Sequence, residues 1–227
     1  MNKHTHLEDL SNEIFLEIFD YLNTFEILTG FTSLNQRISS ILYSIPFCII
    51  IRPNYFYDQV DFLSTHLTSH ADQVIGLLVH DTIRDYSSVI NLLFDRHNFI
   101  NLKSFKLYSI SPSTKFENII KKIENFEKLV TVDIGNQYVD MDEENKLDLT
   151  RTILTHKSSY LHSVLLGYDY NYFDISNYTS ISSTIKSLHL RIRNSCVSLQ
   201  FLLTIFRLCH QVQHLGLRIE HEHAVEK

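Results

Sequence analysis

The chain has 227 residues, of which 44% are hydrophobic and 20% are charged, and this excludes a disordered chain, which lacks the apolar mass to offset the entropy of ordering. Its 20 basic and 26 acidic side chains give a net charge of −6. This charge argues against a general nucleic-acid binder, because such a protein needs a basic face. No apolar run approaches the roughly 18–20 residues that span a bilayer, and no secretory signal is visible at the N-terminus.

The first 46 residues are predicted to form three short helices. The first spans Leu10–Leu22, with Ser11 or Asn12 as its candidate cap and an apolar stripe at helical spacing. Thr24 can cap the second helix, and the apolar positions between Leu34 and Ile45 predict a third, which Pro46 ends. So short a unit buries little surface alone, so we expect its apolar excess to pack against the rest of the chain or against a partner.

The residue order of this unit resembles an F-box. The segment Leu10–Leu22 has the family's opening leucine, an acidic and polar stretch and an Ile-Phe-Asp-Tyr-Leu ending, and Leu28 with Phe31–Ile38 continues the match. Ser11 stands where the family has proline, and Ile38 where it often has an aromatic residue. The resemblance implies docking to a Skp-type adaptor of a cullin-RING ubiquitin ligase by spaced apolar anchors. The adaptor-binding residues that it implies are Leu10, Ser11, Ile14, Ile18, Phe19, Leu22, Leu28 and Leu34.

The remaining chain repeats one pattern, apolar-x-x-apolar-x-apolar, six times. Successive copies begin 28, 27, 32, 24 and 27 residues apart, and each copy predicts a strand. Apolar residues at helical spacing precede most copies, so each unit is predicted to be a helix followed by a strand. Such a unit can bury its apolar face only when it stacks on other units. The copies begin at Val74, Leu102, Leu129, Leu161, Ile185 and Val212, and the predicted helices span Tyr86–Phe94, Phe116–Phe126, Leu147–Leu154 and Leu199–Leu208.

This repetition resembles the leucine-rich repeat family in an irregular form, because that family has a period of roughly 20–29 residues. The family's asparagine or cysteine after each strand is replaced here by Thr82, Ile110, Gln137, Asp169, Arg193 and Glu220. More general α/β stacking is therefore the alternative. We predict an α/β protein with an F-box-like helical domain at residues 1–46, a linker at 47–60, and a leucine-rich-repeat-like solenoid of about six helix–strand units with parallel strands at 61–227.

Alternate residues of stacked strands point away from the helices, and such a face suits protein recognition. An aromatic stretch, Tyr168–Phe173, follows the fourth predicted strand and favours a contact surface there. The alternative is a solvated polar face with no partner. The candidate substrate-binding residues are Lys106, Tyr108, Asp133, Tyr170, Tyr172, His189, Arg191, His214 and Arg218.

Signals of catalysis are missing from the sequence. It contains no His-Glu-x-x-His or Cys-x-x-Cys motif for a metal, no Gly-x-Ser-x-Gly elbow, and its five scattered glycines form no phosphate loop. We therefore expect a non-enzyme without metal or cofactor. The widely spaced Cys48, Cys196 and Cys209 indicate buried thiols in a reducing compartment, the cytosol or nucleus.

These observations favour a substrate-recognition subunit of an SCF-type ubiquitin ligase, with an adaptor at the N-terminal helices, a protein substrate on the repeats, and neither nucleic acid nor membrane as a partner. The alternative is a leucine-rich-repeat interaction scaffold with no ligase role. Its N-terminal helices would only cap the solenoid, with Leu10, Ile14 and Phe19 buried inside.

Overall fold

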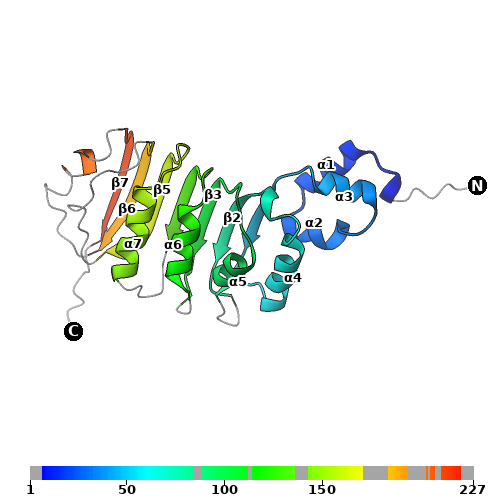
Figure 1. Ribbon diagram of the computed structural model, residues 1–227, viewed down its shortest axis with the longest axis horizontal. Coiled ribbons are helices and arrows are strands. Elements are labelled where there is room, and N and C mark those ends of the chain that lie inside the picture. Colours follow the sequence, from blue (N-terminus) through cyan, green and yellow to red (C-terminus); the bar gives the residue numbers. More distant parts are fainter. Residues whose placement is uncertain are drawn as a thin grey trace, which may run out of the picture.

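The computed structural model describes residues 7–83, 88–111, 114–135, 143–170, 184–193, 203, 205–207 and 211–220. The protein is an elongated row of elements, with three N-terminal helices at one end and a broad twisted sheet along the rest (Figure 1). None of the helices in these ranges combines the length and apolar character needed to cross a membrane.

Seven parallel strands form one sheet, and their order across the sheet is their order along the chain. Each strand therefore pairs with the strands just before and after it in sequence. This confirms the prediction of an α/β protein with parallel strands. The strands are β1 (Phe47–Ile51), β2 (Val74–His80), β3 (Ser104–Tyr108), β4 (Thr131–Gly135), β5 (Ser163–Tyr170), β6 (Ser187–Arg193) and β7 (His214–Glu220).

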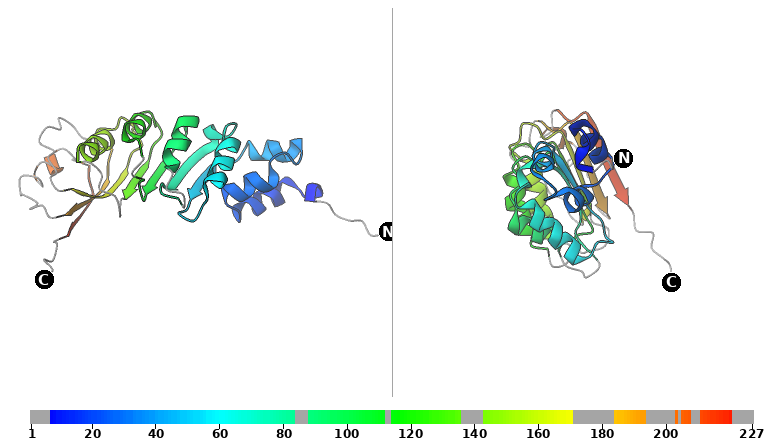
Figure 2. Two further views of the ribbon diagram at one scale, coloured as in Figure 1. Left: turned by 90° about the horizontal axis from the view of Figure 1, so that it is seen from below. Right: turned by 90° about the vertical axis from the view of Figure 1, so that its right-hand side faces the viewer.

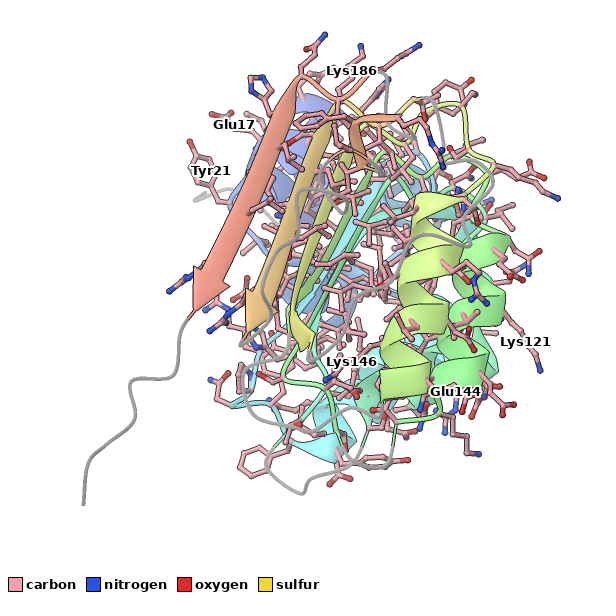
Figure 3. All side chains as sticks on the ribbon, turned by 90° about the vertical axis from the view of Figure 1, so that its left-hand side faces the viewer. Glu17, Tyr21, Lys121, Glu144, Lys146 and Lys186 are labelled. Atoms are coloured by element: carbon pink, nitrogen blue, oxygen red, sulfur yellow. The ribbon has the colours of Figure 1, made fainter. Side chains whose placement is uncertain are left out.

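Helices cover one face of this sheet, as Figure 2 shows. They are α4 (Tyr57–Leu67), α5 (Val89–Arg96), α6 (Phe116–Glu124) and α7 (Glu143–Leu154). Viewed from the β7 end, α6 and α7 lie together on one side of the strands, and Lys121 points from α6 into solvent (Figure 3). The last three match predicted helices, whereas Leu199–Leu208 falls largely outside the described residues.

The core lies between these helices and the sheet because alternate strand residues point toward the helices. Phe94 of α5 shows this packing, with its ring centroid 5.8 Å from that of Phe105 in β3 and 5.9 Å from that of Phe126 in the turn after α6. All three rings are buried. The aromatic and aliphatic residues of each helix–strand unit thus complete the core of the next unit.

Residues 47–60, which the sequence analysis assigns to a linker, contain β1 and the beginning of α4. Phe47, Ile49 and Ile51 are buried toward the helices, as in the later strands. β1 does not match the repeated pattern of the later strands because its register slips by one residue. Phe47 pairs with Val74, but the next residue, Cys48, pairs with Gly76. This slip leaves Pro46 at the position where the apolar pattern begins.

The N-terminal helices are α1 (Asn12–Asp20), α2 (Thr24–Phe31) and α3 (Gln36–Leu42). Asn23 and Glu26 cap α2 reciprocally, since each side chain accepts a hydrogen bond from the other's backbone N–H, at 3.0 and 2.9 Å. The rings of Phe15, Phe19 and Phe31 meet between the helices, with 4.9 Å between the centroids of Phe19 and Phe31. The unit therefore has an aromatic core of its own.

Polar bonds join this unit to the sheet. The Thr24 hydroxyl donates to the backbone oxygen of Cys48 in β1 at 2.8 Å. The Gln73 amide donates to the backbone oxygens of Leu42 and Ile45, both at 2.7 Å. These contacts join the end of α3 to the turn before β2, which makes the junction a packed interface.

A buried carboxylate, Asp81, ties three segments together directly after β2. It accepts hydrogen bonds from the backbone N–H groups of Ile90, at 2.7 Å, and Ser111, at 3.0 Å. The hydroxyls of Ser88, at 3.0 Å, and Thr114 also donate to it. One carboxylate therefore accepts hydrogen bonds from backbone N–H groups at the start of α5 and in the turn that follows β3.

We expect Asp81→Ala to lower the free energy of unfolding by about 3 kcal/mol, because it leaves several buried donors without an acceptor. Equilibrium urea denaturation measures the loss. Asp95→Ala is the control, since Asp95 is exposed and accepts only a 3.4 Å bond from Asn118; its effect should stay within about 0.5 kcal/mol. Equal losses in the two variants would contradict a structural role for Asp81.

Candidate functional site

The face of the sheet opposite α4–α7, here called the open face, presents side chains in straight rows. Parallel pairing aligns Lys106 with Asp133, Asp133 with Leu165, Leu165 with His189, and His189 with Gly216. Two residues further along the strands, Arg191 of β6 pairs with Arg218 of β7. Polar and charged side chains that are more than a hundred residues apart in the sequence therefore lie on one surface.

A hollow of about 640 Å³ lies on the open face over β3–β7, and His80 at the end of β2 also lines it. This volume is in the range of pockets that hold a small molecule or a few residues of a peptide. Five of the residues predicted to bind substrate line it: Tyr108, Asp133, His189, Arg191 and Arg218. The structure therefore brings together the greater part of the candidate set.

Tyr108 and Asp133 form a hydrogen-bonded pair at one side of the hollow. The Tyr108 hydroxyl donates to Oδ2 of Asp133, and the ring lies 5.4 Å from that of His80. Burial, together with the bond to and the charge of Asp133, raises the pKa of Tyr108 well above its ordinary value. Burial lowers the pKa of His80. At neutral pH this side of the hollow therefore holds a protonated phenol and a neutral imidazole.

Three glycines form the floor of the hollow, and sequence reasoning gave them no role. A Cβ at Gly135 would lie 2.9 Å from the Tyr108 ring, and one at Gly216 would clash with Nδ1 of His189. Gly167 lines the hollow between them on β5. None of the described glycines has a positive φ, so the backbone conformation does not require glycine. At Gly135 and Gly216 glycine is needed because a larger residue would clash with a neighbouring side chain. Each of them occupies an outward position of its strand, two residues from another outward residue, and this was the signal that could have identified them.

The backbone is strained at the rim of the hollow. Ser109, directly after β3, has a φ of 50°, which non-glycine residues rarely adopt. Its backbone oxygen accepts hydrogen bonds from the N–H and the hydroxyl of Thr82, at 2.9 and 2.6 Å. Such strain is characteristic of binding sites, where the surrounding contacts hold it in place.

Two other candidate substrate residues, Lys106 and His214, do not line the hollow. Lys106 is half-buried on the same face beside Asp133, and His214 is exposed where β7 begins, in register with Ser187. Tyr170 ends β5, where its backbone pairs with Ile192. Tyr172 falls outside the described residues.

The residues implied for adaptor binding separate by exposure. Phe19 and Leu28 are buried in the core of the helical unit, while Leu10, Ile18 and Leu22 are half-buried. The exposed members are Ser11, Ile14 and Leu34, with Ile14 and Leu34 each 41% exposed.

The exposed members lie on adjoining elements. The Arg37 guanidinium of α3 donates to the backbone oxygen of Leu10 and stacks over the Phe15 ring. This contact sets the start of α3 beside the start of α1. We assign Ile14 on α1 and Leu34 just before α3 to one apolar surface, here called the docking face. The exposed Tyr21, seven residues after Ile14, belongs to the same side of the unit.

No group of three His, Cys, Asp or Glu side chains able to hold a metal ion occurs in the described part of the chain. No protein-family model matches the sequence, and a search of curated proteins finds no similar sequence. The open face and the docking face are therefore the features from which a function can be inferred.

In an Asp133→Asn variant we expect the pKa of Tyr108 to fall toward its ordinary value, because the charge that opposes phenolate formation is gone. It should stay above that value because burial persists. NMR of ¹³C-labelled tyrosine rings across alkaline pH measures the shift, and Tyr108→Phe identifies the resonance. An unchanged pKa would show that Asp133 does not act on this phenol.

Proposed function

We propose that this protein is the substrate-recognition subunit of a cullin-RING ubiquitin ligase of the SCF type. Its N-terminal helices would dock a Skp-type adaptor as an F-box does, and its leucine-rich-repeat-like sheet would hold a protein substrate on the open face. The observation that carries the proposal is the docking face. The helical unit fills its own core with Phe15, Phe19 and Phe31 yet keeps Ile14 and Leu34 in solvent.

Exposed apolar side chains of a small helical unit can act as anchors that enter a groove of a partner protein. In the proposed complex Ile14 and Leu34 would enter the adaptor directly. Phe19 and Leu28, which the F-box resemblance also implies, would act from within by holding α1 and α2 in place. This division of roles follows from their burial.

The proposed mechanism is proximity. The ligase machinery supplies the ubiquitin-transfer chemistry, and this chain raises the effective concentration of the substrate beside it. The bonds from Thr24 to Cys48 and from Gln73 to Leu42 and Ile45 support this role. They couple the helical unit to the sheet, so that the hollow lies at a set distance from the docking face.

A second candidate function is a leucine-rich-repeat scaffold whose N-terminal helices only cap the sheet. One observation favours it, because α2 packs against the edge strand β1 through the Thr24 hydroxyl. In this case the exposure of Ile14 and Leu34 would have no consequence for binding.

The discriminating experiment measures binding of a purified Skp-type adaptor to the full chain by biolayer interferometry. We expect the wild type to bind and the double variant Ile14→Asp, Leu34→Asp to lose at least about tenfold in affinity, since buried apolar anchors contribute more than about 1 kcal/mol each. Both positions are exposed, so the variant should remain folded, as circular dichroism would verify.

The matched control is Ile100→Asp, Tyr160→Asp, which places the same charges at side chains that are 53% and 55% exposed beside the sheet. It should bind like the wild type. Failure of the folded wild type to bind would overturn the ligase proposal in favour of the scaffold.

A further inference from the structure

We propose that His97 is an acid-sensitive clamp between two neighbouring units of the sheet, and that its protonation opens the junction between α4 and α5. Three features of the imidazole ring support the proposal: its burial, its hydrogen bond and the charges around it. The proposal does not depend on the ligase function, because it concerns a junction within the row of helix–strand units.

His97 directly follows α5 and contacts the preceding helix. Its ring nitrogen Nε2 lies 2.9 Å from the hydroxyl oxygen of Ser64 in α4. Ser64 is fully buried, and His97 is only 5% exposed. The His97 ring also packs against the ring of Phe99, with 5.8 Å between the centroids. The imidazole is therefore part of the buried contact between α4 and the end of α5.

The backbone of the same residue is bonded to the next helix. The ammonium group of Lys122 in α6 donates to the backbone oxygen of His97 at 3.0 Å. The helices α4, α5 and α6 are neighbours in the row of units (Figure 1). One residue thus joins three consecutive helices, so a change in its charge acts on the contacts between all of them.

The surroundings of the ring disfavour a charged imidazole. Arg96 at the end of α5 and Lys122 of α6 are cations beside it. Asp61 of α4 is already paired with Arg96 at 2.6 Å, and among the described residues no carboxylate forms an ion pair with the ring. Burial lowers the pKa of His97, and the two cations lower it further, although the bond to Ser64 opposes this shift.

The lowered pKa makes the junction weaker in acid. An open junction exposes His97 to water, where its pKa returns to the ordinary value of 6.5. The open form therefore binds a proton at a higher pH than the closed form. The clamp contributes its full stability above pH 6.5, and this contribution is lost as the pH falls through the lower pKa of the closed form. Acid therefore shifts the population toward the open junction.

This junction lies between the two candidate functional surfaces. The helical unit packs on β1 and α4, whereas the hollow extends from the end of β2 to β7. Opening between α4 and α5 loosens the connection between these parts. Acid would thereby release the docking face and the hollow from their fixed relative position.

Hydrogen–deuterium exchange of the full chain at pH 7.5 and 5.5, read by mass spectrometry, tests the proposal. After correction for the intrinsic exchange rate, we expect exchange in peptides from α4 and the end of α5 to rise about five- to tenfold in acid, because uptake of one proton by an open form of ordinary pKa permits about tenfold at most. Peptides from β4 should change by less than about twofold, since local opening leaves distant units closed.

Three variants assign the effect to His97. His97→Gln replaces the imidazole with a polar side chain that does not titrate, so the acid-induced rise should disappear. His214→Gln makes the same change at an exposed residue of β7 and should keep the wild-type rise. Ser64→Ala keeps the imidazole but removes the hydrogen bond that favours its charged form, so the rise should be at least as large as in the wild type. This last variant decides the question even if His97→Gln does not fold.

Equal exchange of α4 and α5 at the two pH values in the wild type would overturn the proposal. So would an acid-induced rise that persists in a folded His97→Gln variant, or its absence in Ser64→Ala. An equal rise in all peptides would also overturn it, because acid would then act on the whole fold. None of these measurements involves an adaptor, so this proposal and the ligase proposal can fail separately.

Discussion

The in-register pairing of consecutive parallel strands is the constraint on which the rest of the structure depends. Because each strand pairs with the next one along the chain, equivalent positions of successive strands lie side by side. Residues that recur at a regular interval in the sequence therefore form a row across the sheet. Inward rows become the aromatic and aliphatic core around Phe94. Outward rows become the open face, and the hollow exists because glycines recur in those rows on three strands.

Much of the fold could be predicted from the sequence, because stacked units repeat the apolar period that their burial demands. The windows that begin at Val74, Leu102 and Leu129 lead into β2, β3 and β4. The first strand could not be found in this way. The slip places the first buried residue, Phe47, two positions before Ile49, whereas Val74 comes three positions before Leu77 in β2. Pro46 also suggests a break in the sequence. Period searches detect regular register, and a bulge removes the signal.

The site was predicted less completely, for a different physical reason. Alternation along a strand shows which side chains share a face, so Tyr108, Arg191 and Arg218 could be selected. It does not show where a side chain lies once it has left the backbone. Tyr108 lies over Gly135 because that glycine makes room for it, and this relation joins two residues that are distant in sequence. The split of the F-box-like residues into buried and exposed members likewise needed the packing of three helices.

A chain whose strands pair only with their sequence neighbours also has a particular kind of stability. Each unit is supported by the two that flank it, so an edge unit can open without disrupting the units in the middle. The arginine pair lies on β6 and β7, at one end of this row, while the helical unit packs on β1 at the other. Fluctuations that open the hollow therefore need not reach the docking face. The two ends of the sheet can therefore differ in mobility. The β6–β7 end can be the more mobile one, and the β1 end, on which the helical unit packs, the more rigid one.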